Sequence, residues 1–282
     1  MDLVLAKNAG FCFGVKRAID KAFEVLSTGE KKIYSIGSLI HNEQVVNNLK
    51  NKGLIELTDE ESVKNIKNET VIIRTHGIEK HLYNIIEKNG NNIIDLTCPF
   101  VKRIHNIVSE YTDKGYTIIV IGDAAHPEVK GIISYGKDIY VVNSQDDIDK
   151  LNIDRDEPVL IVFQTTTNAS KAQKLVDILR KFYYNSIVID TICNTTKERQ
   201  DEVIDLAKTL DVMLIIGSNS SSNTKKLYEE SKRYCDKSYI ISSVDDLKKI
   251  YLSEKSKVGI SAGASTPQYL IEEILKNVRN EF

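Results

Sequence analysis

The sequence predicts an α/β protein made of three similar units, and two kinds of repetition support this fold class. Cys12, Cys98 and Cys193 lie about 90 residues apart, close to a third of the 282-residue chain. After each cysteine the same order follows: a lysine four residues later, a helical apolar pattern, and an apolar strand ending in glycine. Repetition at a fixed spacing is typical of repeated structural units.

Each repeat continues with further strands and helices. The first strand ends in Gly37, Gly122 or Gly217 and a polar loop, and another apolar strand then runs into a second polar loop. The first two repeats return to the next cysteine through segments 93–98 and 188–193. Strands that alternate with helices predict a parallel or mostly parallel sheet covered by helices.

We therefore predict three α/β units, at residues 1–97 with the N-terminal Cys12 segment, 98–192 and 193–282. Ligands of such sheets bind at the carboxyl ends of the strands, where the polar loops lie. We expect the units to form a pseudo-threefold trefoil, with these loops converging on a central cavity.

Composition excludes several classes of protein. The chain is 41% hydrophobic and 28% charged, which is typical of a folded globular protein. Its net charge of −2 gives no global field for binding nucleic acid or an anionic membrane. The N-terminus does not resemble a secretory signal, and no apolar run approaches the ~18 residues of a membrane helix. We expect a cytoplasmic protein without nucleic-acid or membrane partners.

The three repeated cysteines predict a metal centre. In a reducing compartment cysteines do not form a disulfide framework, and three thiolates that meet need a cation to offset their repulsion. Two kinds of centre remain open: an iron–sulfur cluster with one open iron, or a three-cysteine zinc site with an open position. The competing interpretation is that each cysteine is a small buried packing residue. Cys235 has no counterpart in the other repeats, and we predict that role for it.

The strand-end loops carry hydroxyl, amide and imidazole groups with few full positive charges. This chemistry suits a phosphorylated ligand held by neutral donors and helix N-terminal amides. The residues in these loops are His41, His76, His126, Thr165, Thr166, Ser221, Ser222, Asn223 and Ser265.

Glu128 is the first candidate for a proton donor, because partial burial beside a polar ligand would raise its pKa. The alternative is a glutamate that only stabilises the start of a helix after Pro127. We expect His81 and His105 to be solvated or packing residues.

Two further patterns receive structural interpretations. The lysine–arginine pairs after the cysteines could contact acidic neighbours or the rim of the cavity, but we expect them to form a solvated helical face. The segment 131–137 nearly matches a phosphate-binding loop, but it runs into a strand where that motif requires a helix, so we reject it.

Nine motifs, in order from residue 10 to residue 265, resemble those of one family, LytB/IspH. They are Gly10-Phe-Cys12-Phe-Gly14-Val, Ile40-His41-Asn42, Arg74-Thr-His76-Gly77, Asp95-Leu-Thr-Cys98-Pro, His126-Pro-Glu128-Val, Gln164-Thr-Thr166, Ile192-Cys193-Asn-Thr-Thr196, Ser221-Ser-Asn223 and Ala262-Gly-Ala-Ser265. Members of this family are 4-hydroxy-3-methylbut-2-enyl diphosphate reductases, which act last in the non-mevalonate (MEP) isoprenoid pathway.

The resemblance implies an iron–sulfur oxidoreductase. A [4Fe–4S] cluster would be held by Cys12, Cys98 and Cys193, and its one open iron would bind the substrate's hydroxyl group. Two electrons and two protons would release this hydroxyl as water, which leaves isopentenyl diphosphate and dimethylallyl diphosphate. Glu128 would supply protons, assisted by Thr165. An electron donor such as ferredoxin or flavodoxin is implied by the family alone.

The resemblance also assigns the loop residues. His126 is both a catalytic and a substrate-binding candidate, and Gln164 matches a neighbouring pocket position. The substrate-binding set is His41, His76, His126, Thr165, Thr196, Ser221, Ser222, Asn223 and Ser265. Two other classes stay open: a zinc-dependent hydrolase of a phosphorylated substrate, and an iron–sulfur electron carrier or redox sensor.

Overall fold

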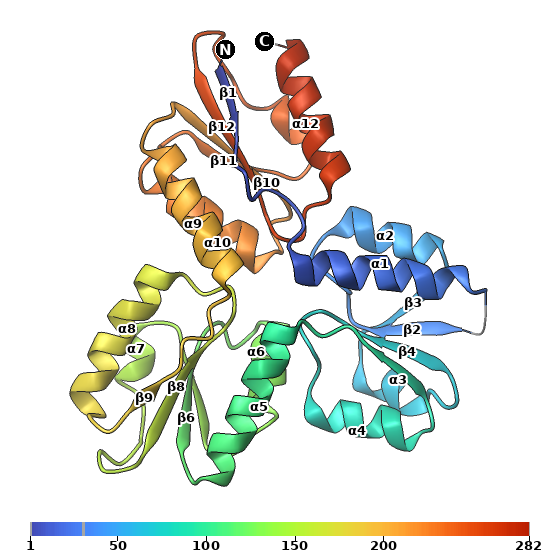
Figure 1. Cartoon of the computed structure of the whole chain (residues 1–282), viewed down its shortest axis with the longest axis vertical. Coiled ribbons are helices and arrows are strands. Elements are labelled where there is room, and N and C mark those ends of the chain that lie inside the picture. The colour runs from blue at the N-terminus through green and yellow to red at the C-terminus, as the bar shows by residue number, and fades with distance from the viewer. Residues whose placement is uncertain (1, 30–31, 282) are drawn as a thin grey trace. The chain divides into compact units, whose positions relative to one another are not determined.

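The structure, a computed structural model, describes residues 2–29 and 32–281. These residues form two compact units. We call the described parts of 1–16, 40–48 and 194–282 the terminal unit, and the described parts of 17–39 and 49–193 the middle unit. Figure 1 labels the helices and strands of both units.

The described strands form three four-stranded sheets, and every pairing is parallel. The middle unit holds two sheets, ordered β3-β2-β4-β5 and β7-β6-β8-β9, and the terminal unit holds one, ordered β11-β10-β12-β1. The strands are β1 (Asp2–Leu5), β2 (Ile33–Ile36), β3 (Leu54–Leu57), β4 (Thr70–Ile73), β5 (Asn92–Asp95), β6 (Thr117–Ile121), β7 (Ile139–Val142), β8 (Val159–Phe163), β9 (Ile187–Val188), β10 (Val212–Ile216), β11 (Ser238–Ile241) and β12 (Lys257–Ala262).

Helices connect the strands, as parallel pairing requires. They are α1 (Phe13–Ser27), α2 (Glu43–Asn51), α3 (Glu60–Asn65), α4 (Lys80–Lys88), α5 (Pro99–Asp113), α6 (Pro127–Ile133), α7 (Gln145–Ile148), α8 (Ala169–Phe182), α9 (Asn194–Ala207), α10 (Ser222–Lys232), α11 (Val244–Leu247) and α12 (Gln268–Glu281). Segment 131–137 contains the end of α6 and leads into β7, so rejecting it as a phosphate-binding loop is confirmed.

The three sheets share one topology. In each, the first strand along the chain lies between the second and the third, and the fourth lies outside the third. In the terminal unit β1 takes the place of the fourth strand by pairing with β12. The prediction of three similar, parallel α/β units is therefore confirmed, although no sequence pattern indicated the β1–β12 pair. The boundaries at residues 97 and 192 stay predictions.

In each sheet of the middle unit the connections leave the first and third strands in opposite directions, which creates a switch point. In the terminal unit β10 and β12 are neighbours in the same strand order, and α12 follows β12. Ligands of open α/β sheets bind at the carboxyl side of such points. The polar loops singled out in the sequence follow these strands: β2 and β4, β6 and β8, and β10 and β12. The fold thus places the candidate residues where a parallel sheet can bind a ligand.

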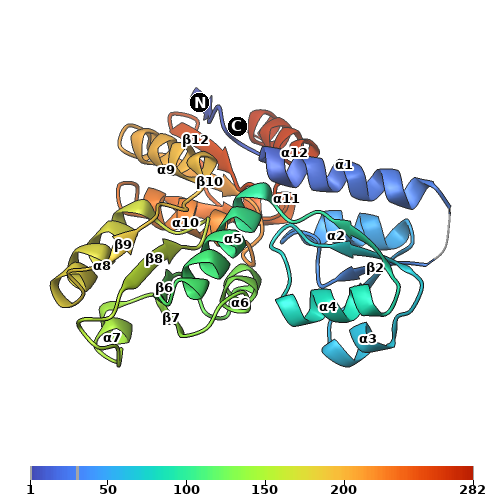
Figure 2. The ribbon, with the colours of Figure 1, turned by 60° about the horizontal axis from the view of Figure 1, so that its bottom comes forward.

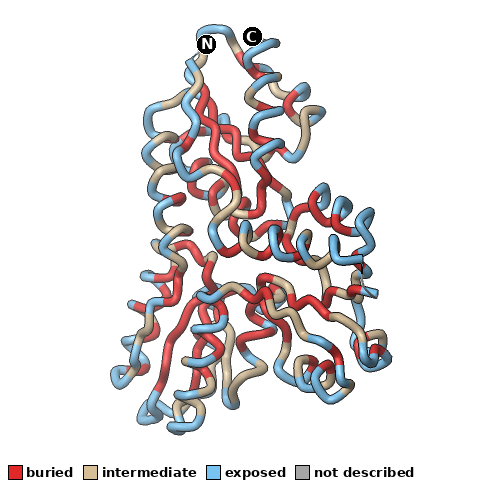
Figure 3. The backbone as a smooth tube through the Cα atoms, turned by 45° about the vertical axis from the view of Figure 1, so that its right-hand side comes forward, coloured by how far each residue is buried: buried red, intermediate tan, exposed pale blue. Residues whose placement is uncertain are grey.

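The sheet of β6 and β8 shows how the core is built. Residues 159–163 are buried throughout because helices cover both faces of the sheet. Ile119 and Ile161 pack with side chains of α8, whereas Ile118 and Leu160 pack with side chains of α5 and α6. Figures 1 and 2 show α5 and α8 on either side of this sheet, and Figure 3 shows its strands as mostly buried.

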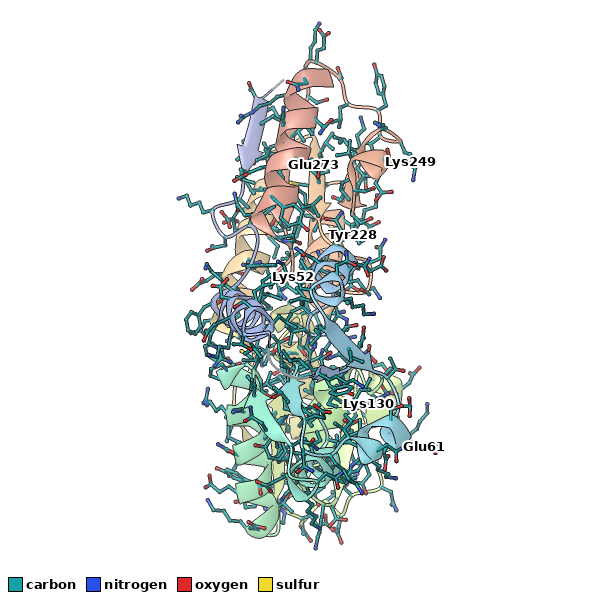
Figure 4. The ribbon with its side chains drawn as sticks, turned by 90° about the vertical axis from the view of Figure 1, so that its right-hand side faces the viewer. Lys52, Glu61, Lys130, Tyr228, Lys249 and Glu273 are labelled. Carbon is teal, nitrogen blue, oxygen red and sulfur yellow. The ribbon has the colours of Figure 1, made fainter. Side chains whose placement is uncertain are left out.

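The outer surfaces of both units are charged. Glu61 on α3 and Lys249 after α11 are exposed and extend away from the ribbon (Figure 4). No helix in the described parts of the chain is both long and apolar enough to cross a membrane.

Candidate active site

The three repeated cysteines occupy equivalent positions. Each follows the fourth strand of its sheet and stands directly before a helix. The backbone N–H of each cysteine donates to the carbonyl two residues beyond the end of the third strand. The three bonds run from Cys12 to Ala264 (3.3 Å), from Cys98 to Thr75 (2.9 Å) and from Cys193 to Thr165 (3.0 Å). All three are partly buried thiols, held at the carboxyl ends of their sheets.

The loop before Cys98 is further ordered by Asp95. Its carboxylate accepts the backbone N–H of Thr97 at 2.9 Å and pairs with Lys102 at 2.6 Å. Burial acts to raise the pKa of Asp95, but these hydrogen bonds outweigh it and the pKa is lowered. Asp190 accepts the backbone N–H of Ile192 in the same way, at 3.1 Å, before Cys193. The loops before Cys98 and Cys193 therefore contain the same type of turn, in which an aspartate accepts the backbone N–H two residues later.

Glu128 lies on α6 with its carboxyl group turned inward. One carboxyl oxygen accepts the backbone N–H of Thr165 at 2.6 Å, and the other accepts the Thr165 hydroxyl at 2.8 Å. Only 1% of Glu128 is exposed. Burial raises its pKa to about 7, although both bonds from Thr165 act to lower it. The carboxyl group can therefore hold or release a proton near neutral pH.

Two histidines lie beside each other in the middle unit. His126 is the N-cap of α6, and its Nδ1 accepts the backbone N–H of Glu128 at 3.1 Å. The neutral ring must therefore carry its proton on Nε2. The ring of His76 meets that of His126 edge to face, with centroids 5.3 Å apart. Both belong to loops at the carboxyl ends of strands, as predicted.

His105 and His81 have the roles expected for them. His105 is buried and stacks on Tyr135, with ring centroids 4.1 Å apart, and burial lowers its pKa to about 4. Gly77 turns with a φ of +74°, and a Cβ there would lie only 2.8 Å from the ring of His105. His105 thus packs beneath the turn after His76. His81 is exposed, 3.4 Å from Glu60.

In the terminal unit a second group of polar residues gathers at the carboxyl ends of β10 and β12. The Ser265 hydroxyl donates to the carbonyl of His41 at 3.2 Å and lies 3.3 Å from the Ser221 hydroxyl. Ser221 caps α10, and Ser222 opens that helix.

Asn223, in the first turn of α10, is buried in the same unit. Its Oδ1 accepts the backbone N–H of Ala264 at 2.9 Å. Among the described residues its buried Nδ2 has no hydrogen-bond partner. A buried amide donor of this kind predicts a ligand that accepts a hydrogen bond.

Thr196 and Gln164 are buried. Thr196 lies on α9, and Gln164 accepts the backbone N–H of Asp123 while its amide donates to Thr166. Cys235 is buried in an apolar cluster, and its thiol donates to the carbonyl of Asp211, so its predicted packing role is confirmed.

One expectation is wrong for part of its set. The lysine–arginine pairs were expected to be solvated, and Arg103 is exposed. Arg17, however, is half-buried and donates hydrogen bonds to two backbone carbonyls before Cys98, because the turn there presents both acceptors to its guanidinium group. Arg199 is buried in the same kind of contact before Cys12. The only sequence signal was the recurrence of arginine after each cysteine.

The raised pKa of Glu128 predicts a pH-dependent stability. Between pH about 4.5 and about 7 the folded protein binds more protons at this carboxyl than the unfolded chain does, so stability falls as pH rises. The loss across this window is on the order of 3 kcal/mol. Urea unfolding at pH 5 and pH 8 should show this loss in the natural protein and a smaller one in Glu128→Gln. Equal losses in both proteins would contradict the assignment.

The profile of the LytB protein family matches residues 3–279, which is nearly the whole chain. The chain belongs to the LytB family. A curated LytB relative from Caldanaerobacter subterraneus subsp. tengcongensis, named 4-hydroxy-3-methylbut-2-enyl diphosphate reductase, is 41% identical over 282 residues. The alignment covers 99% of this chain and 97% of the relative. The resemblance found in the sequence motifs is thereby confirmed.

Two solved structures agree with this LytB assignment. The E-1-hydroxy-2-methyl-but-2-enyl-4-diphosphate reductase from Plasmodium falciparum matches with a TM-score of 0.92 at 30% identity, covering 98% of this chain and 87% of that one. An (E)-4-hydroxy-3-methyl-but-2-enyl diphosphate reductase, described as the terminal enzyme of the non-mevalonate pathway, matches with a TM-score of 0.71 at 39% identity. That match covers 99% of this chain and all of the other.

Proposed function

We propose that the protein is a 4-hydroxy-3-methylbut-2-enyl diphosphate reductase that catalyses the last step of the non-mevalonate isoprenoid pathway. The observation that carries the proposal is that Thr165 forms hydrogen bonds with both Cys193 and Glu128. Its carbonyl accepts the N–H of Cys193, while its own N–H and hydroxyl donate to Glu128. Thr165 thus links a carboxyl group that can exchange a proton to the backbone of Cys193, one of the three repeated cysteines.

The reaction is a reductive removal of a hydroxyl group. The substrate's allylic C–O bond breaks, the oxygen leaves as water, and a C–H bond forms on the remaining five-carbon diphosphate. Two electrons and two protons balance this change. Protonation at either end of the allylic system gives isopentenyl diphosphate or dimethylallyl diphosphate.

The three repeated cysteines fit an iron–sulfur cluster. Thiolates are the ligands that such clusters prefer, and Cys12, Cys98 and Cys193 have equivalent backbone anchors at strand ends. We propose that they hold a [4Fe–4S] cluster with one open iron. When bound, the cluster supplies the electrons and a Lewis-acidic iron. The electron donor is expected to be a ferredoxin or a flavodoxin, and the cytoplasmic location stays a prediction.

The protein's own acid–base chemistry centres on Glu128. With a pKa raised to about 7, a substantial fraction of the carboxyl group is protonated near neutral pH. Thr165 holds both carboxyl oxygens and fixes the direction in which the proton is presented. His126 cannot donate through Nδ1, which already accepts a hydrogen bond, so it offers the Nε2 proton. We assign proton delivery to Glu128 and orientation of a polar substrate group to His126.

The diphosphate is assigned to neutral donors. In the terminal unit the hydroxyls of Ser221 and Ser265 and the amide of Asn223 lie at the start of α10, where helix N–H groups favour an anion. Neutral donors bind the diphosphate while avoiding a cost of burying extra cations. The full proposed set is His41, His76, His126, Thr165, Thr196, Ser221, Ser222, Asn223 and Ser265.

Replacing Asn223 by aspartate should weaken substrate binding. Asn223→Asp keeps an acceptor for the N–H of Ala264 but exchanges the buried amide donor for a negative charge. We expect KM to rise by about a hundredfold, with a smaller change in kcat, because the charge repels the diphosphate. Asn219→Asp, in the same loop but exposed, controls for added charge at a distance. An unchanged KM in Asn223→Asp would remove this residue from the site.

The hydroxyl of Thr165 should lower the pKa of Glu128. Thr165→Val removes a hydrogen bond that favours the charged carboxylate, so the pKa of Glu128 should rise further. We expect the alkaline limb of the pH–rate profile to move up by about one pH unit and kcat to fall roughly tenfold. Thr165→Ser, which keeps the hydroxyl, should retain the natural profile. Identical profiles for the valine variant and the natural protein would contradict the coupling.

The function itself is tested with anaerobically purified protein. Iron and sulfide analysis, together with the visible spectrum, should show a brown iron–sulfur protein. Reduced viologen should then drive conversion of 4-hydroxy-3-methylbut-2-enyl diphosphate to the two five-carbon products. A colourless protein that contains zinc and hydrolyses the substrate would replace the proposal with the zinc-hydrolase alternative. A clustered protein without turnover would favour the electron carrier.

A further inference from the structure

Two arginines bind the backbone immediately before two of the three repeated cysteines. In the middle unit, Nη2 of Arg17 on α1 donates to the carbonyls of Leu96 (3.2 Å) and Thr97 (2.9 Å), the two residues before Cys98. The guanidinium group of Arg17 thus binds the end of the turn that precedes Cys98.

The terminal unit repeats this arrangement before Cys12. Nη2 of Arg199 on α9 donates to the carbonyl of Gly10 at 2.6 Å, and Nη1 donates to that of Ala262 at 3.1 Å. Gly10, like Leu96, stands two residues before its cysteine. It has a φ of +97°, a conformation that glycine adopts without strain, so the arginine fixes a turn that is intrinsically permissive.

An arginine is suited to this task in a way that lysine is not. Its planar guanidinium group reaches further than a lysine ammonium and carries five N–H donors in fixed directions. Arg199 binds two carbonyls through two nitrogens, and Arg17 binds two carbonyls through Nη2. Arginine also keeps its positive charge at any physiological pH. Arg199 is only 3% exposed, and burying a cation is costly unless hydrogen bonds and nearby negative charge compensate. A thiolate-ligated cluster would add negative charge to the turns whose carbonyls both arginines bind, one or two residues before Cys98 and Cys12.

The third cysteine is anchored differently. Thr191 stands two residues before Cys193, and its hydroxyl donates to the carbonyl of Phe163 at 2.6 Å and accepts its N–H at 2.7 Å. This side chain ties the turn to the end of β8 directly. Arg103, which follows Cys98 as Arg17 follows Cys12, is exposed. The chain therefore provides a matched arginine outside the anchoring role.

We propose that Arg17 and Arg199 are positioning residues for the cluster. Each fixes the turn whose cysteine binds iron, and each adds a fixed positive charge that favours the reduced cluster. The second effect follows because nearby charge and hydrogen bonding set the reduction potential of such clusters. This inference rests on the proposed function, since it requires a bound cluster.

The test uses paired substitutions that separate charge from geometry. Arg17→Met and Arg199→Met remove both, whereas Arg17→Lys and Arg199→Lys keep the charge and lose the two-carbonyl contact. Arg103→Met is the control. Three quantities are measured on anaerobic protein: the rate of cluster loss to an iron chelator, the midpoint potential of the cluster, and amide hydrogen exchange in peptides that contain Cys12 and Cys98.

We expect cluster loss to be about tenfold faster in all four Arg17 and Arg199 variants, because each loses hydrogen bonds from a charged group. The midpoint potential should become more negative in the methionine variants and stay near the natural value in the lysine variants. Exchange should accelerate at Cys98 in the Arg17 variants and at Cys12 in the Arg199 variants. Arg103→Met should match the natural protein in all three measurements.

Two results would overturn the inference. One is a midpoint potential that is unchanged in both methionine variants, because a purely structural role would leave it so. The other is an effect of Arg103→Met as large as those of the anchoring arginines. If the natural protein holds no iron, the proposed function fails, and hydrogen exchange still reports whether the arginines order the turns. The two failures are therefore distinguishable.

Discussion

Replacing Glu128 by glutamine should abolish most turnover while the protein still folds and binds substrate. Glutamine has nearly the same shape as glutamate, and it can accept the N–H of Thr165 while its amide donates to the threonine hydroxyl. The buried contacts of α6 are thus preserved. What disappears is the exchangeable proton. General acid catalysis contributes about 10²–10⁴ in rate, so we expect kcat to fall by that range.

The measurement must separate chemistry from binding. Steady-state kinetics with reduced viologen should show a lower kcat with KM changed by less than about threefold, since the removed group acts on the reacting atoms. Iron content per chain should equal that of the natural protein, because Glu128 is not among the proposed ligands. The Thr165→Val variant, which loses only a hydroxyl group beside Glu128, is the milder comparison. Full activity of Glu128→Gln would exclude this residue from the proton path.

The repeated units could be predicted because they depend on local order in the sequence. A glycine-ended strand, a polar loop and a helix recur after Cys12 and Cys98 in the same sequence positions, and the same order of elements folds into the same strand order. The candidate loops could be placed for the same reason. Parallel strands place their carboxyl ends at one edge of the sheet, so the polar loops after β4 and β8 could be predicted to lie at the edge where such sheets bind ligands.

Other features depend on tertiary packing and have no local signal. The strand β1 is four residues long and pairs with β12, more than two hundred residues later in the chain. Arg17 and Arg103 follow their cysteines at the same distance, each after a lysine, yet Arg17 contacts backbone carbonyls and Arg103 is exposed. What distinguishes them is which turn each helix face meets, and this is decided by elements distant in sequence.

The role of Glu128 lies between these cases. The sequence identified the residue but left two interpretations, a proton donor or a helix-start glutamate. The structure shows that it does stand in the first turn of α6. Its carboxyl group, however, is buried against Thr165 and keeps a pKa near 7, which a solvated helix-start glutamate would not. Burial, which a sequence pattern does not report for one residue, favours the proton-donor interpretation, which the Glu128→Gln variant tests.

Replacing Cys98 by serine should remove the cluster without unfolding the protein. Cys98 is the N-cap of α5 and donates its backbone N–H to Thr75, and serine is a preferred N-cap residue that keeps this N–H. The fold should therefore persist. A serine oxygen is a hard and poor ligand for an iron–sulfur cluster compared with a thiolate. We expect iron per chain to fall strongly and turnover to drop by more than about a hundredfold.

Cys235→Ser provides the matched control, because it makes the same chemical change at a cysteine outside the repeated set. Cys235 is buried, and its thiol donates to the carbonyl of Asp211, a bond that a serine hydroxyl can replace. This variant should lose about 1 kcal/mol of stability and keep its iron. Iron analysis and thermal unfolding of both variants distinguish loss of a cluster ligand from a general loss of stability. Normal iron in Cys98→Ser, or equal iron loss in both proteins, would show that the three repeated thiols do not act as one set of cluster ligands.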